Sequence, residues 1–379
     1  MSEAAGLYVH VPFCAAVCPY CDFAVEKETT VGRAGFVEAL LHEISLRSGS
    51  SGEIDTIYFG GGTPTALSSD QLTRLVDAVR THFRGARGAG FHLEANPEDV
   101  SDESAKAWKA LGVEFLSLGI QSFDAATLRT LGRRHGREQA LAAVGAAQKA
   151  GIATVSVDLI YGLLGEDPAR IARDIETASR AAADHVSCYQ LTIHERTVFG
   201  KRAARGERLA LEGDDEADLF FAVHARLADA GLEAYEASNF ARSPAHRSRH
   251  NRKYWRHVPY LGLGPSAHSF DGRRRSWNHR SRAAWLRALA DGVLPTEGDE
   301  TLSDAALIEE AFLLGLRTAE GVDLLALRDR TFPRLPSVNV QALESAAAAG
   351  LLGRVDAERI VPTIRGMAVA DELAGALLQ

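Results

Sequence analysis

The chain alternates short apolar segments with longer amphipathic ones over its first half. Six apolar or β-branched segments predict strands, at residues 7–11, 54–59, 91–94, 115–120, 154–160 and 186–191. Between them, apolar positions recur at helical spacing at residues 35–46, 70–83, 102–111, 137–150 and 168–182. This alternation predicts βαβ units with a parallel sheet, wound in one direction by right-handed crossovers. Six units are too few for a closed eight-stranded barrel, so we expect an open barrel or a doubly wound sheet.

The pattern changes after Pro295. Residues 304–315 and 340–348 predict helices, and residues 351–355 and 359–363 predict the two strands of a hairpin. Together they indicate a small helical, winged-helix-like domain, a shape that does not by itself assign a function. We expect it to dock over the barrel mouth and to cover the long connection 242–282. The expected domains are a barrel at 1–230, a connecting segment at 231–298 and a C-terminal domain at 299–379.

Composition narrows the class of protein. With 379 residues, 46% of them hydrophobic, the chain can bury one large core and a smaller one. A net charge of −8 argues against a global affinity for nucleic acid or membrane surfaces, though not against a local basic patch. The first residues do not have the basic and apolar regions of a signal peptide, and no apolar run is long enough to cross a bilayer. We therefore expect a cytoplasmic protein that is not an integral membrane protein.

Three of the four cysteines fall within eight positions, directly after the first predicted strand. Cys14, Cys18 and Cys21 have the spacing C-x3-C-x2-C, and three thiolates can hold three corners of a cubane iron–sulfur cluster, leaving one iron open. A structural zinc site wants a fourth ligand, and a disulfide framework needs more cysteines and an oxidising compartment. The spacing therefore favours a cluster. The fourth cysteine, Cys188, lies inside a predicted strand and is expected to be a buried thiol.

With its lead-in Tyr8-x-His10-x-Pro12-Phe13-Cys14, this loop resembles the cluster-binding signature of the radical S-adenosylmethionine (SAM) superfamily. It is most similar to the coproporphyrinogen oxidase-like branch, which comprises the HemN and HemW proteins, and the similarity extends over nearly the whole chain. The resemblance implies a partial (β/α)6 TIM-like barrel, a 4Fe-4S cluster on the three loop cysteines, and SAM on the open iron. In that superfamily the reduced cluster cleaves SAM to a 5′-deoxyadenosyl radical, while the protein positions the reactants and excludes solvent.

Residues at the ends of the predicted strands match the superfamily's SAM contacts. The resemblance implies this set: Tyr8, Gly60, Gly61, Gly62, Thr63, Glu94, Gln121, Arg133 and Asp158. The glycine turn lets the backbone pass close to the methionyl amino group, and Glu94 matches the position that binds ribose hydroxyls. An ionised Asp158 inside an apolar strand needs a partner, for which we expect Arg133. Gln121, Arg133 and Asp158 would fit a structural salt-bridge network equally well.

Two further features bear on function. Phe23 stands where the oxidase has a fourth cysteine, which argues against oxidation of coproporphyrinogen and is the pattern of the HemW branch. Residues His250, Asn251, Tyr254 and Trp255 resemble that branch's heme-binding motif, in which an imidazole can ligate iron, rings can pack on the macrocycle and arginines can pair with propionates. The resemblance implies a heme chaperone, with no catalytic side chain assigned, that passes heme to an acceptor such as a membrane-associated cytochrome or respiratory protein.

Two other functions stay open at the level of sequence. The chain could be an enzyme, either an oxygen-independent coproporphyrinogen III oxidase or a HemN-like radical SAM methyltransferase. Alternatively, the basic and aromatic residues of the 246–257 segment suit stacking on nucleic acid, as in a nucleic-acid-binding or -modifying protein. The same segment also fits a solvated loop over a buried Trp255.

Overall fold

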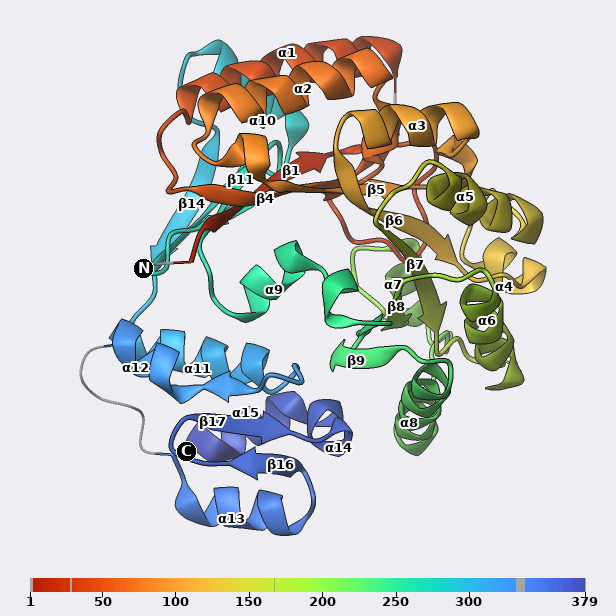
Figure 1. Ribbon diagram of the computed structural model, residues 1–379, viewed down its shortest axis with the longest axis vertical. Coiled ribbons are helices and arrows are strands. Elements are labelled where there is room, and N and C mark those ends of the chain that lie inside the picture. The colour runs from red at the N-terminus through yellow and green to blue at the C-terminus, as the bar shows by residue number, and fades with distance from the viewer. Residues whose placement is uncertain (1–2, 28, 167, 332–337, 379) are drawn as a thin grey trace.

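The computed structural model describes residues 3–27, 29–166, 168–331 and 338–378. A sheet of twelve strands curves around a concave face (Figure 1). Its centre consists of parallel strands in chain order: β1 (Ala5–Val11), β4 (Ile54–Gly61), β5 (Gly90–Ala95), β6 (Val113–Gln121), β7 (Thr154–Tyr161) and β8 (His185–Gln190). These are the predicted strands, and the predicted partial (β/α)6 barrel is confirmed.

Helices cover the convex face of this sheet (Figure 1). They are α1 (Thr30–Leu46), α2 (Ser69–His82), α3 (Asp102–Ala110), α4 (Ala125–Thr130), α5 (Arg137–Lys149) and α6 (Pro168–Arg180). Along β1, Leu7 and Val9 are buried in the core under these helices, whereas Tyr8 and His10 face the other way. Because successive side chains of a strand point to opposite faces of the sheet, the aromatic and polar side chains of β1 face the concave side.

Both edges of the sheet are extended by residues that we expected to form a separate connecting segment. On one side lie β11 (Tyr260–Leu263), parallel to β1, and then β12 (His268–Phe270), β13 (Arg274–Asn278) and β14 (Thr296–Thr301). On the other side β10 (Asn239–Ala241) and β9 (Glu233–Glu236) follow β8. The remaining helices of this part are α7 (Val198–Ala203), α8 (Asp214–Asp229) and α10 (Arg282–Ala290). No break in the sheet therefore coincides with residue 230, because the edges of β1 and β8 are both paired.

Helix α9 (Arg249–Trp255) lies inside the concave face, against β1 and β4 (Figure 1). Lys253 Nζ lies 2.7 Å from Asp55 Oδ1, near the start of β4, and Arg249 Nη1 lies 3.7 Å from Glu114 Oε1, near the start of β6. Helix α9 thus covers the amino-terminal ends of the parallel strands. The carboxyl ends of the strands stay uncovered by α9. In parallel α/β folds the loops at these ends form the functional site.

The C-terminal domain has its own hydrophobic core and a three-stranded antiparallel sheet. Its elements are α11 (Asp304–Gly315), β15 (Val322–Asp323), α12 (Leu324–Thr331), α13 (Val340–Ala348), β16 (Leu352–Val355), β17 (Arg359–Pro362), α14 (Ile364–Ala368) and α15 (Ala370–Leu378). The two predicted helices and the predicted hairpin are confirmed.

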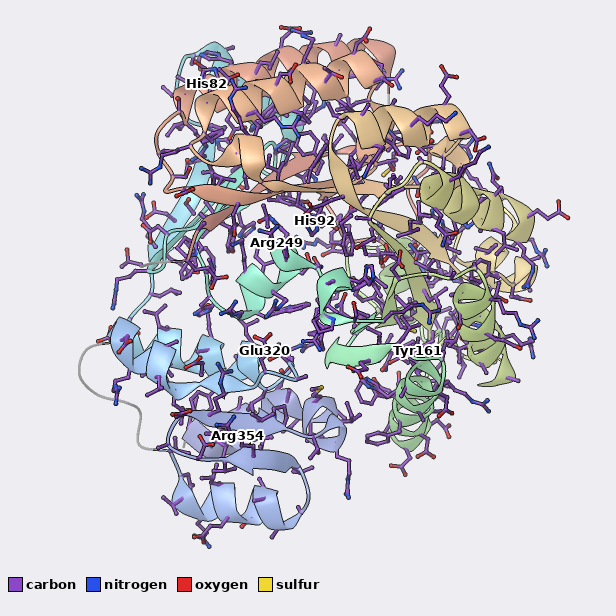
Figure 2. All side chains as sticks on the ribbon, in the orientation of Figure 1. His82, His92, Tyr161, Arg249, Glu320 and Arg354 are labelled. Atoms are coloured by element: carbon purple, nitrogen blue, oxygen red, sulfur yellow. The ribbon has the colours of Figure 1, made fainter. Side chains whose placement is uncertain are left out.

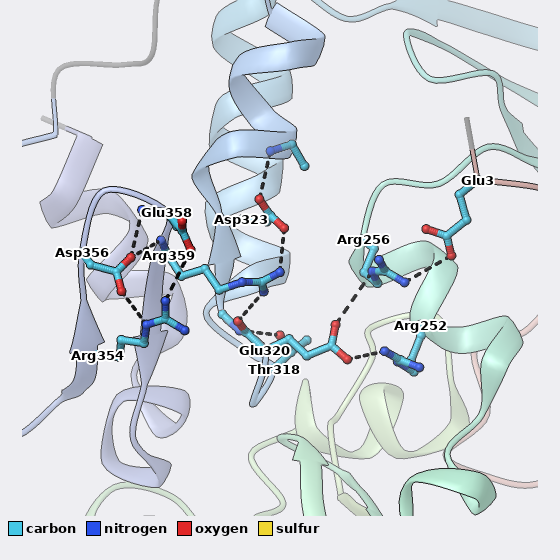
Figure 3. Close-up of polar contacts among 12 residues, drawn as sticks. Glu3, Arg252, Arg256, Thr318, Glu320, Asp323, Arg354, Asp356, Glu358 and Arg359 are labelled. Atoms are coloured by element: carbon cyan, nitrogen blue, oxygen red, sulfur yellow. Dashed lines mark hydrogen bonds and ion pairs between the residues drawn. The ribbon is translucent and has the colours of Figure 1, made fainter. Parts of the chain in front are cut away.

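The docking side of this domain differs from our expectation. Arg252 and Arg256 of the α9 region both form ion pairs with Glu320, which follows α11 (Figure 3). The domain does cover part of the 242–282 connection, but it sits on the amino-terminal side of the barrel strands rather than over the mouth. Backbone hydrogen bonds between Tyr235 and Ala319 and between Ala237 and Arg317 accompany these ion pairs. Among the described helices, none has the length and apolar composition needed to cross a bilayer.

Candidate functional site

A cavity of about 480 Å³ opens at the carboxyl ends of the parallel strands. All three loop cysteines line it, together with most of the residues predicted for SAM: Gly61, Gly62, Thr63, Glu94, Gln121, Arg133 and Asp158. Two predicted residues do not line it. Gly60 packs against the side chains of Tyr58 and Glu94. Tyr8 lines a neighbouring cavity. The fold therefore gathers predicted residues that are up to 144 positions apart in the chain (Cys14 to Asp158) around one space.

The cysteine loop is closed at its base by two short parallel strands, β2 (Phe13–Cys14) and β3 (Glu26–Lys27). Two side chains from outside the loop donate to its sulfur atoms. Thr63 Oγ1 lies 3.6 Å from Cys14 Sγ, and Arg133 Nη1 lies 3.6 Å from Cys18 Sγ. Burial raises the pKa of Cys14 to about 11 and also raises the pKa of Cys21. These thiols keep their protons at neutral pH until a metal displaces them, and donors to sulfur then stabilise the thiolates.

The cysteines suit a cluster better than a single ion. Within the described residues, no three His, Cys, Asp or Glu side chains converge closely enough to hold one metal ion. A cubane places each thiolate on a separate iron, so its ligands need not converge on one point. Cys14, Cys18 and Cys21 all face the cavity and are partly exposed to it. The residues present therefore fit a 4Fe-4S cluster.

The glycine turn at the end of β4 presses against β1. At Gly61, which has φ of 105°, an added Cβ would lie 2.4 Å from the His10 ring, and at Gly62 it would lie 2.7 Å from the Phe13 carbonyl oxygen. The Gly61 amide donates to Glu94 Oε2 at 3.0 Å, and the Gly62 amide donates to the Val11 carbonyl. Since both amides are already bonded, a ligand at this turn meets carbonyl oxygens, which suit an amino group.

Two partly buried carboxyl groups face the same cavity. Glu94 Oε1 accepts a hydrogen bond from the Tyr58 hydroxyl at 2.6 Å, and Asp158 Oδ1 accepts one from Ser117 Oγ at 2.9 Å. Burial raises the pKa of Glu94 to about 7 and that of Asp158 to about 6. The nearby Asp158 also raises the pKa of Glu94, so a cationic ligand such as a sulfonium would favour the ionised carboxylates.

Arg133 does not take the partner that we expected from the sequence. Its Nη2 donates to Asn96 Oδ1 at 2.5 Å and to the Gly119 carbonyl at 2.6 Å, and Asn96 Nδ2 in turn donates to Thr63 Oγ1 at 2.9 Å. The expected Asp158–Arg133 pair is therefore wrong as a direct contact, because serine hydroxyls satisfy Asp158 instead. Arg133 links the cluster loop to the glycine turn.

Gln121 ends β6 in a left-handed backbone conformation, with φ of 70°, and the pairing with β7 shifts register just before it. Such strain in a residue other than glycine costs free energy and is concentrated at functional sites. The shift turns the Gln121 side chain toward the cavity. This local irregularity supports Gln121 as a ligand-contacting residue.

The residues of the predicted heme motif lie away from the cluster cavity. His250 is 1% exposed, and its ring nitrogens are hydrogen-bonded to Thr56 Oγ1 at 2.9 Å and to the Tyr254 hydroxyl at 2.8 Å. Trp255 lies against Tyr235, where α9 meets the C-terminal domain. Figure 2 shows Arg249 and His92 where α9 meets the sheet. Tyr254 alone of the motif lines the cavity next to the cluster loop.

Comparison with known proteins agrees with this geometry. Residues 8–178 match the model of the radical SAM superfamily, and residues 302–369 match that of the HemN C-terminal domain. The heme chaperone HemW of Mycobacterium tuberculosis is 37% identical over 98% of this chain and 94% of its own length. The heme chaperone HemW of Bacillus subtilis is 31% identical over 98% of each chain.

The chain belongs to the HemW family of radical SAM proteins. The superfamily's cofactors, a 4Fe-4S cluster and SAM, are thereby assigned to it. The solved structure of coproporphyrinogen III oxidase (HemN) from Escherichia coli is similar in fold, with a TM-score of 0.84 and 21% identity over 99% of this chain and 90% of that one. HemW and HemN proteins thus share the barrel and the C-terminal domain.

The cavity also contains residues that we did not predict for this HemW family member. Asn96 follows β5, and Tyr189 and Gln190 end β8. Each stands at the carboxyl end of a parallel strand, so the rule that such ends meet at one edge could have found them. From the sequence alone, however, a polar residue at the end of a strand is too common a feature to identify a site residue.

Proposed function

We propose that this chain is a heme chaperone that holds a 4Fe-4S cluster and SAM, binds heme and transfers it to an acceptor protein. The observation that carries the proposal is the match to relatives named heme chaperone HemW across nearly the full length of both chains. The acceptor that we propose is a membrane-associated cytochrome or another respiratory protein.

For the cofactors, we propose the residues that share the larger cavity. Cys14, Cys18 and Cys21 would hold the cluster, which when reduced supplies an electron to SAM. The carbonyls of the glycine turn would take the amino group, and Glu94 the ribose. Arg133 and Asn96 would hold the loop and the turn in register, and burial of the cavity would exclude water.

A nucleic-acid function gains no support from the basic segment. Most of its cations are paired within the protein: Arg249 with Glu114, Lys253 with Asp55, and Arg256 with Glu3 at 3.1 Å. A phosphate backbone requires free cations, and these side chains already have carboxylate partners. The basic run therefore serves the packing of α9.

Phe23 argues against the alternative function, that of a coproporphyrinogen oxidase. Its ring is 67% exposed in the loop between the two cavities, and phenylalanine can neither ligate metal nor take part in redox chemistry. We expect no protoporphyrinogen when the reconstituted protein is incubated anaerobically with SAM, a reductant and coproporphyrinogen. Turnover at or near about 1 s⁻¹ would contradict this expectation.

Heme transfer tests the proposed function directly. The protein is reconstituted anaerobically, loaded with one equivalent of hemin, and mixed with heme-depleted membranes. We expect heme-dependent respiratory activity to return faster than with the same concentration of free hemin. If the protein binds hemin saturably but restores respiratory activity no faster than free hemin does, it binds heme without being a chaperone for these acceptors.

A further inference from the structure

A second cavity, of about 350 Å³, lies beside the cluster loop, at the edge of the barrel formed by β1, β11 and β12. Small-molecule sites occupy roughly 300–1,000 Å³. Its walls are aromatic and basic: Phe23, Tyr254, Tyr260, His10, His268 and Arg280. Asp22 and Phe23 line this cavity and the cluster cavity alike, so only the cluster loop separates the two.

The walls match a flat, apolar ligand that carries carboxylates. The rings of Tyr254 and Tyr260 meet edge to face at 4.7 Å, and the exposed Phe23 on the cluster loop lines the same cavity. Arg280 Nη2 donates to the Asp22 carbonyl at 2.8 Å and lies 3.9 Å from Asp22 Oδ1, a longer contact than the one that Asp22 makes with Arg196 at 3.0 Å. A guanidinium has five N–H donors, so others are left for a carboxylate such as a propionate.

Two of the three histidines near this cavity are already committed. His250 has both ring nitrogens hydrogen-bonded and does not line the cavity. His10 Nε2 lies 2.9 Å from the Ala24 carbonyl, which can only accept, so Nε2 carries the proton and Nδ1 accepts from the Tyr8 hydroxyl at 3.1 Å. Neither imidazole can bind iron without breaking these bonds.

His268 is different. It begins β12, is exposed to the cavity and lies nearly parallel to Trp277 at 5.9 Å. Within the part of the chain that the structure describes, we find no hydrogen bond to either of its ring nitrogens. Burial and the nearby Arg275 lower the pKa of His268, so the imidazole is neutral at pH 7, the form that ligates metals.

We propose that His268 ligates the heme iron, with Tyr254, Tyr260 and Phe23 against the macrocycle and Arg280 beside a propionate. This inference rests on the proposed heme-binding function and names its site. His250 then acts as a positioning residue: it stands one helical turn before Tyr254 and holds the Tyr254 hydroxyl at 2.8 Å. The histidine of the heme-like motif thereby shapes the cavity without touching iron.

Anaerobic hemin titration of the cluster-reconstituted protein tests the assignment. We expect His268→Ala to weaken hemin binding at least tenfold and to shift the Soret band, and added imidazole to restore the band. His250→Gln and Tyr254→Phe should keep the parent's Soret band and weaken binding only a few-fold. His82→Ala, on surface helix α2, is the matched control and should titrate like the parent (Figure 2).

Three results would overturn the proposal. If His268→Ala keeps the parent's affinity and spectrum while the parent binds hemin, the ligand assignment fails and the heme-binding function stands. If His250→Gln alone loses the band and recovers it with imidazole, iron binds at His250. If the parent itself does not bind hemin saturably, the proposed function and this inference fail together.

Discussion

At the residue scale, the cluster site depends on which thiols the fold exposes to the cavity. Cys14, Cys18 and Cys21 are partly exposed there, with donors from Thr63 and Arg133 near two of the sulfurs. Cys188 is buried on β8, and burial raises the pKa of its thiol. Exposure to the cavity therefore distinguishes the three cysteines proposed as cluster ligands from a cysteine of the hydrophobic core.

This difference supplies a matched pair of variants. Cys18→Ala removes one proposed cluster ligand, and Cys188→Ala removes a thiol from the core at a cost of about 1 kcal/mol. After anaerobic reconstitution, we expect Cys18→Ala to hold little iron and sulfide and Cys188→Ala to match the parent's four of each. Full iron and sulfide content in Cys18→Ala would contradict the assignment.

Glu43 is a buried carboxylate that binds the turn between β11 and β12. Its oxygens accept hydrogen bonds from Arg47, Asn278, Trp285 and the Gly264 amide at 2.8 Å, in the turn that leads to His268. Four donors left without an acceptor are costly. We expect Glu43→Ala to lower the free energy of unfolding by about 3–5 kcal/mol, measured by urea denaturation.

A glutamate on the same helix provides the control. Glu38 on α1 forms an exposed ion pair with Arg74 at 2.8 Å. Exposed pairs contribute little, so Glu38→Ala should change the free energy of unfolding by at most about 1 kcal/mol. Equal losses in the two variants would show that the Glu43 network does not stabilise the turn.

At the element scale, α9 connects the barrel with the C-terminal domain. Glu320 lies between Arg252 and Arg256, and Arg256 also reaches Glu3 (Figure 3). Each of these ion pairs is partly exposed and individually weak, but Glu320 is shared by two arginines. These ion pairs join the C-terminal domain to the amino-terminal side of the barrel, next to the backbone hydrogen bonds of Tyr235 and Ala237.

Charge reversal at this contact is informative. We expect Glu320→Lys, which faces two arginines, to lower stability by about 1–2 kcal/mol and to speed proteolysis between residues 316 and 321. Glu358→Lys, which breaks an exposed pair with Arg354 in the hairpin, should stay within about 0.5 kcal/mol of the parent. Calorimetry measures the first effect, and unchanged proteolysis in Glu320→Lys would contradict the docking role.

At the scale of the whole molecule, a layer of buried histidines fills the barrel between the sheet and α9. Burial lowers the pKa of His92 and of His185 to about 3, and strongly lowers that of His250. Because the unfolded histidines titrate near pH 6.5, the stability that these groups contribute is present above pH 6.5 and is lost as pH falls. The partly buried Glu94 and Asp158, with raised pKa values, act in the opposite direction.

His92 offers a test of this balance. Its ring stacks on Phe115 at 4.7 Å, and its Nδ1 has no hydrogen-bond partner among the described residues. We expect His92→Leu to make the free energy of unfolding less dependent on pH between 6.5 and 4.5, by about 1.4 kcal/mol per pH unit. Parallel pH profiles for the variant and the parent, measured by denaturation at each pH, would contradict the buried neutral state of His92.

The sequence by itself determined the parallel strands, the helices that follow them and the cysteine loop, because period, turn chemistry and ligand spacing are local properties. It also placed Glu94, Gln121 and the glycine turn at strand ends, which meet at one edge in any parallel fold. Only the tertiary structure decided the partners. Arg133 binds Asn96 rather than Asp158, and the basic run of α9 meets carboxylates from distant segments. His250 is buried against Thr56, 194 positions away, because side chains far apart in the chain become neighbours only when the sheet closes around α9.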